Sequence, residues 1–144
     1  MRYLLLLPIL MACQTTPVKP VEPPVVITDL IQLETNPKPP KSSDFFVTRG
    51  ANKTVTVSSK LLSPAAKKVK VSISGSSGVE VDPKDFTLTG NASADIIINV
   101  PQNASNDVPY FYINGQALDS NNNPVVSNGV TIKFQWTVPA PPTP

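Results

Sequence analysis

The stretch that decides the fold is Thr131–Val138, TIKFQWTV. Its apolar residues all fall on one parity, and polar residues fill the other: the apolar set is Ile132, Phe134, Trp136 and Val138. Because successive side chains of a β-strand point to opposite faces, this alternation predicts a strand with one buried and one solvated face. The stretch also holds the only Trp of the chain. We therefore place Trp136 in the centre of the core.

The same alternation recurs upstream, in short runs separated by turn residues. No window of adequate length shows a helical stripe. Short strands at this spacing within residues 42–139 predict an all-β fold, an antiparallel β-sandwich of seven to eight strands. Besides the final strand, the expected strands are Phe45–Thr48, Thr54–Ser58, Lys68–Ser74, Val79–Val81, Asp85–Thr89, Asp95–Val100 and Tyr110–Leu118.

Three motifs in this region resemble bacterial immunoglobulin-like domains. They are GVEVDP at Gly78–Pro83, FTLTG at Phe86–Gly90 and IIINVP at Ile96–Pro101, followed by a Tyr-rich strand. The resemblance implies an immunoglobulin-like sandwich. The Cys pair of antibody domains is absent, and the Trp lies in the last expected strand instead of the third. The fold type therefore carries over, and no binding residue of the family does.

Composition narrows the range of functions. The chain has 144 residues, enough for one domain with flanking segments, and a net charge of +2 from scattered Lys and Arg. This charge indicates no nucleic-acid partner. The chain has no His and one Cys, which removes His-based catalysis, His metal sites and an internal disulfide. We predict no enzyme, cofactor or metal, although a hydrolase that uses only carboxylates stays open.

The N-terminus has the pattern of a signal peptide. Arg2 precedes an apolar run, Tyr3–Met11, which is much shorter than the roughly 20 residues that span a bilayer as a helix. We therefore predict that residues 1–12 are a cleaved signal peptide.

Leu10-Met11-Ala12-Cys13 resembles the lipobox of bacterial lipoproteins. The resemblance implies cleavage before Cys13 and attachment of acyl chains such as palmitate to it, so that the membrane is a partner. Two or three chains hold a protein stably, because each buried CH₂ contributes about 0.8 kcal/mol. Gln14 stands where Asp would favour the inner membrane in this family, so the resemblance implies an outer-membrane lipoprotein of the cell envelope.

Proline marks both flanks of the domain. Of the 17 prolines, seven lie between residues 17 and 40 and four between residues 139 and 144. Such segments favour polyproline-II geometry. We predict that residues 13–41 form the lipidated Cys and a Pro-rich tether, that residues 42–139 form the sandwich, and that residues 140–144 form a Pro-rich tail.

An apolar segment, Val25–Leu33 (VVITDLIQL), interrupts the tether. Its periodicity fits a helix and a strand almost equally. It is an extra strand or turn packed on the domain, a docking segment for a partner protein, or an unstructured linker. As a docking segment it would use Ile27, Leu30 and Ile31.

Two sets of polar residues resemble a metal site and a catalytic site, but each has a simpler interpretation. Asp119–Asn123 has the D-x-N-x-N spacing of a calcium loop, but Pro124 replaces the required Gly, so we predict a plain turn. Two of the three carboxylates Glu80, Asp82 and Asp85 could form the pair that glycoside hydrolysis uses. We interpret them as solvated charges of edge strands.

Tyr110 and Tyr112 alternate with Phe111 and Ile113. If the latter two are core, both Tyr rings stand on the outer sheet face, where they suit a sugar or peptide partner. Cross-strand packing and the tyrosine corner of immunoglobulin-like folds are the alternatives.

These observations predict a lipid-anchored cell-envelope protein. It would display an immunoglobulin-like domain for non-enzymatic binding or a structural role, with an envelope protein or a glycan as partner. Two alternatives stay open: an accessory lipoprotein of a secretion or pilus apparatus, docking through Val25–Leu33, and a phage-encoded lipoprotein acting in lysis or superinfection exclusion.

Overall fold

The computed structural model describes residues 29–39, 45–105 and 108–139. The predicted signal peptide, Cys13, Ile27 and the tail at 140–144 lie outside the described residues. Among the described residues no helix is long and apolar enough to cross a membrane. The described chain is all-β, with eight strands: β1 (Ile31–Asn36), β2 (Asn52–Leu61), β3 (Lys68–Gly75), β4 (Glu80–Asp82), β5 (Asp85–Thr89), β6 (Ser93–Asn99), β7 (Tyr110–Leu118) and β8 (Val130–Gln135).

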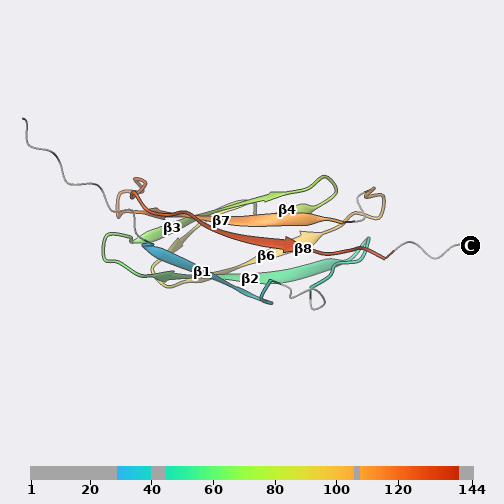
Figure 1. Cartoon of the computed structure of the whole chain (residues 1–144), viewed down its shortest axis with the longest axis horizontal. Coiled ribbons are helices and arrows are strands. Elements are labelled where there is room, and N and C mark those ends of the chain that lie inside the picture. Colours follow the sequence, from blue (N-terminus) through green and yellow to red (C-terminus); the bar gives the residue numbers. More distant parts are fainter. Residues whose placement is uncertain (1–28, 40–44, 106–107, 140–144) are drawn as a thin grey trace, which may run out of the picture.

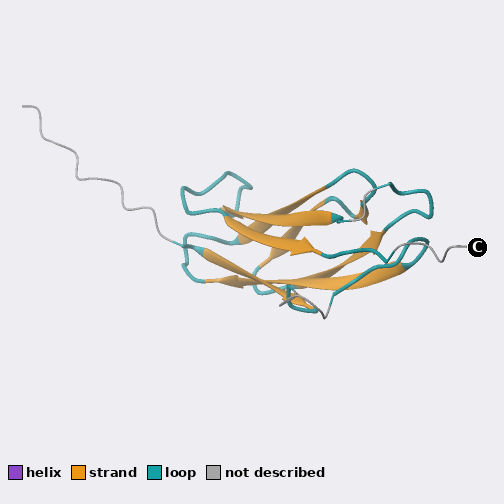
Figure 2. Ribbon diagram, turned by 45° about the vertical axis from the view of Figure 1, so that its right-hand side comes forward, coloured by secondary structure: helices purple, strands orange, loops and turns teal. Residues whose placement is uncertain are grey.

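The strands form two antiparallel sheets of four strands each, which face one another (Figures 1 and 2). Sheet A has the order β1-β2-β6-β4, and sheet B has the order β5-β3-β7-β8. β4 and β5 belong to one extended segment, which passes from the edge of sheet A to the edge of sheet B between Asp82 and Asp85.

The strand order is that of an immunoglobulin fold. In that fold the strands ABED form one sheet and CFG the other. Here β1-β2-β6-β4 faces β3-β7-β8, and β5 adds an edge strand beside β3. The predicted immunoglobulin-like sandwich of seven to eight strands is therefore confirmed, with eight.

The core lies between the sheets and is built by period-two alternation. Each of the four central strands supplies fully buried side chains at alternate positions. Burying one such side chain stabilises the fold by about 1.5–3 kcal/mol. The set is Val55 and Val57 of β2, Ile96 and Ile98 of β6, Val69 and Val71 of β3, and Phe111 and Ile113 of β7.

Four aromatic rings fill one end of this core. Phe111 and Phe134 stack with centroids 4.6 Å apart, and Trp136 meets Phe45 edge to face at 5.3 Å. The Trp136 indole N–H donates a 3.0 Å hydrogen bond to the Val47 carbonyl. This bond satisfies the one polar atom of a ring that is only 6% exposed. The predicted burial of Trp136 is confirmed, but the indole lies at one end of the core and not in its centre.

The alternation of apolar and polar residues predicted which side chains are buried better than it predicted which backbone segments pair in a sheet. Phe45–Thr48 was expected to be a strand, and it is not one, although Phe45 and Val47 are each only 2% exposed. β8 likewise ends at Gln135, yet Val138 is still buried. Both segments cover the aromatic end of the core without joining a ladder.

The sandwich begins earlier than predicted. Residues 31–36 were assigned to the tether, but they form β1, which pairs with β2 along its whole length. Ile31 and Leu33 are buried in the core. Gly115 of β7 makes room for β1 across the sandwich, because a Cβ at that position would lie 2.7 Å from Leu33 Cδ1. The boundary at residue 42 is therefore wrong.

The same burial corrects the docking hypothesis. Leu30 is 8% and Ile31 is 1% exposed, and the Leu30 carbonyl accepts a hydrogen bond from the Leu62 N–H. These two side chains stabilise the domain and are not free to contact a partner. Of the three interpretations of Val25–Leu33, its described part supports the extra strand.

Candidate functional site

Tyr110 and Tyr112 lie on the outer face of sheet B. The parity of β7 places them there, because Phe111 and Ile113 between and beside them have no exposed surface. The two rings are half-buried against each other, with centroids 5.5 Å apart in an edge-to-face arrangement. The predicted orientation of both rings therefore matches the structure.

Lys133 of β8 completes this arrangement. It lies opposite Tyr112 in the β7–β8 register, and its Nζ is 5.6 Å from the centroid of Tyr110 and 5.8 Å from that of Tyr112. An ammonium at this distance is attracted to the ring face. We call Tyr110, Tyr112 and Lys133 the tyrosine platform. It offers apolar ring surface, two hydroxyls and a positive charge.

A structural role accounts for part of this geometry. The rings pack on each other and on the Lys133 ammonium, as cross-strand neighbours do. The tyrosine corner would need a bond from a Tyr hydroxyl to the backbone upstream. No such bond from Tyr110 or Tyr112 occurs among the described residues. The hydroxyls are thus left for water or for a partner.

The Asp119–Asn123 loop is a turn held by its own acid. Asp119 Oδ1 accepts hydrogen bonds of 2.8 Å from the N–H groups of Asn121 and Asn123, and Oδ2 accepts one from the Asn123 side chain. The Asn123 backbone bond is the largest cause that lowers the pKa of Asp119, followed by the Asn123 side chain. Within the described ranges, no three acidic or Cys side chains gather closely enough to hold a metal.

The switch between sheets separates Asp85 from Glu80 and Asp82. Glu80 and Asp82 point outward from β4 at the edge of sheet A, whereas Asp85 begins β5 at the edge of sheet B. All three are exposed, and Glu80 accepts a 2.8 Å hydrogen bond from the Asn99 side chain. The arrangement matches solvated charges on edge strands.

Sequence patterns alone did not identify Lys133 as part of the platform. The alternation in β8 places its side chain outward, but only the register brings it beside Tyr112. The 11 residues between β7 and β8 do not determine which residues of the two strands pair, so the register cannot be read from the sequence.

Comparison with known proteins adds little to the fold. No protein-family model matches the chain, and no curated protein matches it. The crystal structure of the periplasmic chaperone SfaE is 11% identical, with a TM-score of 0.47; the match covers 79% of this chain and 59% of that one. A FixG-related protein from Vibrio parahaemolyticus is 7% identical, with a TM-score of 0.46, over 77% of this chain and 98% of that one. The fold assignment rests on the strand order.

Proposed function

We propose that this chain is a lipid-anchored protein of the cell envelope that displays an immunoglobulin-like sandwich for non-enzymatic binding through the tyrosine platform. The observation that carries the proposal is the position of the platform relative to the start of the described chain. Asp29 begins the described chain just before β1, which starts toward one end of the long axis (Figure 1). Its carboxylate accepts a 2.7 Å hydrogen bond from the Asn128 side chain. The platform lies toward the other end, where the Trp136 N–H donates to the Pro109 carbonyl.

This separation suits display from a membrane. In the proposal, the acyl chains on Cys13 enter the bilayer, and the Pro-rich tether leads to Asp29. At about 3.1 Å per residue, an extended segment between those two residues would reach about 50 Å. The end of the sandwich that starts at Asp29 then faces the membrane, and the platform lies toward the far end, on a side face of the sandwich.

The chemistry of the platform supports binding instead of catalysis. Exposed Tyr rings and a Lys give contact area, hydrogen bonds and charge, which suit an envelope protein or a glycan. The chain supplies no His for acid–base work, and Glu80, Asp82 and Asp85 are exposed on edge strands. Docking through Leu30 and Ile31 is disfavoured because both side chains are buried.

The anchor is tested by blocking lipoprotein processing. With globomycin, or with Cys13→Ala, we expect the unprocessed precursor to accumulate and acyl labelling of the protein to be lost. Gln14→Ala serves as the matched control, since it leaves the lipobox intact. Normal processing in the presence of globomycin would remove the lipid anchor from the proposal.

The platform is tested by co-sedimentation of the detergent-solubilised full chain with isolated sacculi. Tyr112→Ala should weaken retention, whereas Thr87→Ala, an exposed change on β5 of the same sheet, should not. Equal retention of both variants would remove a glycan of the sacculus as the partner of the platform.

A further inference from the structure

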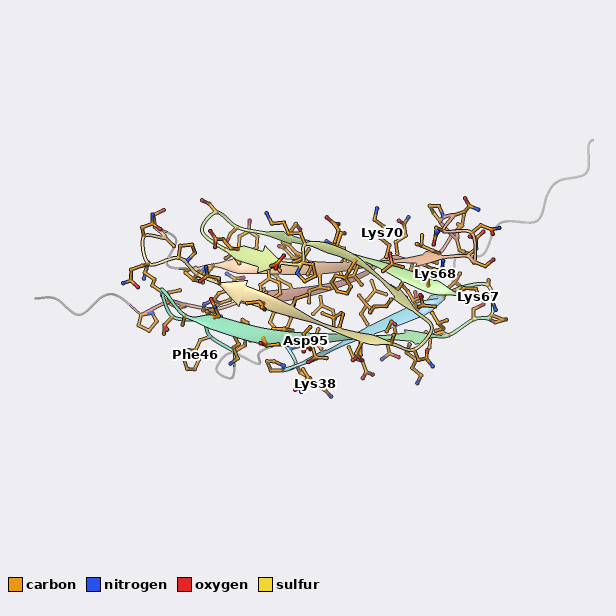
Figure 3. All side chains as sticks on the ribbon, turned by 180° about the vertical axis from the view of Figure 1, so that it is seen from behind. Lys38, Phe46, Lys67, Lys68, Lys70 and Asp95 are labelled. Carbon is orange, nitrogen blue, oxygen red and sulfur yellow. The ribbon has the colours of Figure 1, made fainter. Side chains whose placement is uncertain are left out.

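The two outer faces of the sandwich differ in charge. The outward residues of sheet A include four carboxylates and one lysine: Glu34, Glu80, Asp82, Asp95 and Lys60. Those of sheet B include three lysines and one carboxylate: Lys68, Lys70, Lys133 and Asp85. Figure 3 shows Lys70 and Asp95 on opposite sides of the molecule, with Lys38, which follows β1, on the side of Asp95.

On sheet A the acids surround an exposed apolar side chain. Ile97 of β6 is 46% exposed, and Asp82 of β4 lies directly opposite it in the register. Asp95 shares the face two residues earlier, and Glu80 lies two residues from Asp82 on β4. We call Ile97, Glu80, Asp82 and Asp95 the acidic patch. Their carboxylates form no ion pair with a Lys or Arg in the described part of the chain, so their charge is not neutralised there.

The tyrosine platform is the complement of this patch. It presents aromatic surface where the patch presents Ile97, and it presents Lys133, with Lys70 further along the sheet, where the patch presents carboxylates. Neither lysine forms an ion pair with a described carboxylate. Opposite potentials and matched apolar centres are what a specific contact requires.

The patch and the platform also lie at the same level along the sandwich. Ile97 is three residues from Val100, and Tyr112 is three residues from Pro109; both of these residues bond to the loops at the end away from Asp29. At about 3.3 Å per residue, each centre is about 10 Å from that end. Two copies that stand side by side in the same direction would therefore bring patch and platform together.

We propose that the partner of the tyrosine platform is a second copy of this chain, which presents its acidic patch. This inference rests on the proposed function, because it names the partner of the same surface. The contact joins two different faces, so repetition gives rows of molecules instead of closed dimers. Since the copies point in the same direction, every Asp29 in a row lies on the same side, as anchoring in one membrane requires.

The size of the faces predicts weak association. Four strands about 4.8 Å apart and about 20 Å long present roughly 400 Å². A stable interface buries about 800 Å² per partner, so this one is weak in dilute solution. Anchoring in a membrane raises the effective concentration, and the test belongs there.

The first test is cysteine cross-linking of the full chain in cell membranes. Thr54 lies opposite Ile97, and Ser74 lies opposite Tyr112; both are exposed. We expect a disulfide dimer when Thr54→Cys and Ser74→Cys chains are co-expressed, and none from either variant alone. The parent chain, with its single Cys13, sets the baseline.

A control distinguishes the direction of packing. Ser93 lies at the opposite end of the same face of β6, so Ser93→Cys should give no dimer with Ser74→Cys. Dimers between identical positions, or a 93–74 dimer as strong as the 54–74 dimer, would overturn the proposal.

The second test exchanges charges. Asp82→Lys and Lys133→Glu should each reduce the yield of the 54–74 dimer about tenfold or more, because like charges then face each other. The double variant Asp82→Lys/Lys133→Glu should restore the yield, and a misfolded chain could not be restored in this way. Unchanged yield in the single variants, or no recovery in the double variant, contradicts the inference. If Asp82→Lys fails to fold, Asp95→Lys takes its place with the same expectations.

The same samples separate failure of this inference from failure of the proposed function. Detergent extraction of the membranes reports whether the chain is anchored. A chain that is anchored but gives no 54–74 dimer overturns self-association and leaves the anchored display module in place. Loss of the chain from the membrane fraction overturns the anchor instead.

Discussion

Phe45 and Phe46 are neighbours of the same type that the fold treats in opposite ways. Phe45 is 2% exposed and meets three core rings edge to face, at 4.9 Å from Phe134, 5.3 Å from Trp136 and 6.0 Å from Phe111. Phe46 is 55% exposed. Lys53 Nζ lies over both rings, at 5.0 Å and 5.6 Å. The pair therefore isolates the effect of core packing.

The structure predicts a large difference between the two truncations. Phe45→Ala leaves a cavity among the aromatic rings, and such changes lower the free energy of unfolding by about 3–5 kcal/mol. Phe46→Ala loses an exposed cation–π contact, worth about 0.5–1 kcal/mol. Because domains of this size are stable by about 5–15 kcal/mol, the first change consumes a large share of the total.

Urea unfolding measures the difference. With a slope near 2 kcal/mol per molar urea, Phe45→Ala should lower the midpoint by about 2 M and Phe46→Ala by less than about 0.5 M. Far-UV circular dichroism should accompany Trp136 fluorescence, since Phe45 contacts the indole. Equal shifts for the two variants would show that residues 45–48 do not cover the core, and would refute this account of the segment.

Three further predictions concern single positions. Gly115→Ala should lower the free energy of unfolding by about 1–3 kcal/mol, because the added Cβ would meet Leu33. If β1 packs there, the double variant Gly115→Ala/Leu33→Ala should lose less stability than the sum of the losses in the two single variants. Trp136→Phe should lower the free energy of unfolding by about 1–3 kcal/mol, because the Val47 carbonyl loses its hydrogen-bond donor. A smaller loss of stability in thermal or urea unfolding would contradict this hydrogen bond. The lowered pKa of Asp119 means that its carboxylate stabilises the fold above the unfolded-state pKa, and that this contribution is lost as the pH falls through the lower folded-state value. Asp119→Ala should therefore be less stable than the parent at neutral pH, with the gap narrowing in acid; a gap independent of pH would contradict the role of the carboxylate.

Much of the fold could be predicted because burial follows side-chain alternation. The bounds of β5 and β7 match the prediction, and Trp136 is buried as expected. Alternation reports which side chains are buried, but not which backbone groups are paired. For that reason Phe45–Thr48 was predicted as a strand, although it only covers the core.

The missed strand and the missed site residue have a common cause. Ile31–Asn36 has only three side chains that point into the core, and proline-rich stretches flank it. Its composition therefore indicated a tether. What makes it a strand is its pairing with β2 and the space above Gly115, both of which are long-range. Lys133 joins the tyrosine platform through register, which is also a property of pairing and not of local sequence.

Intact-mass analysis of the mature chain extracted from membranes shows whether a lipid on Cys13 holds the sandwich at a membrane. We expect an N-terminus at Cys13 that carries the mass of at least two acyl chains. A chain that still begins at Met1, or one cut elsewhere and free of acyl mass, would contradict it.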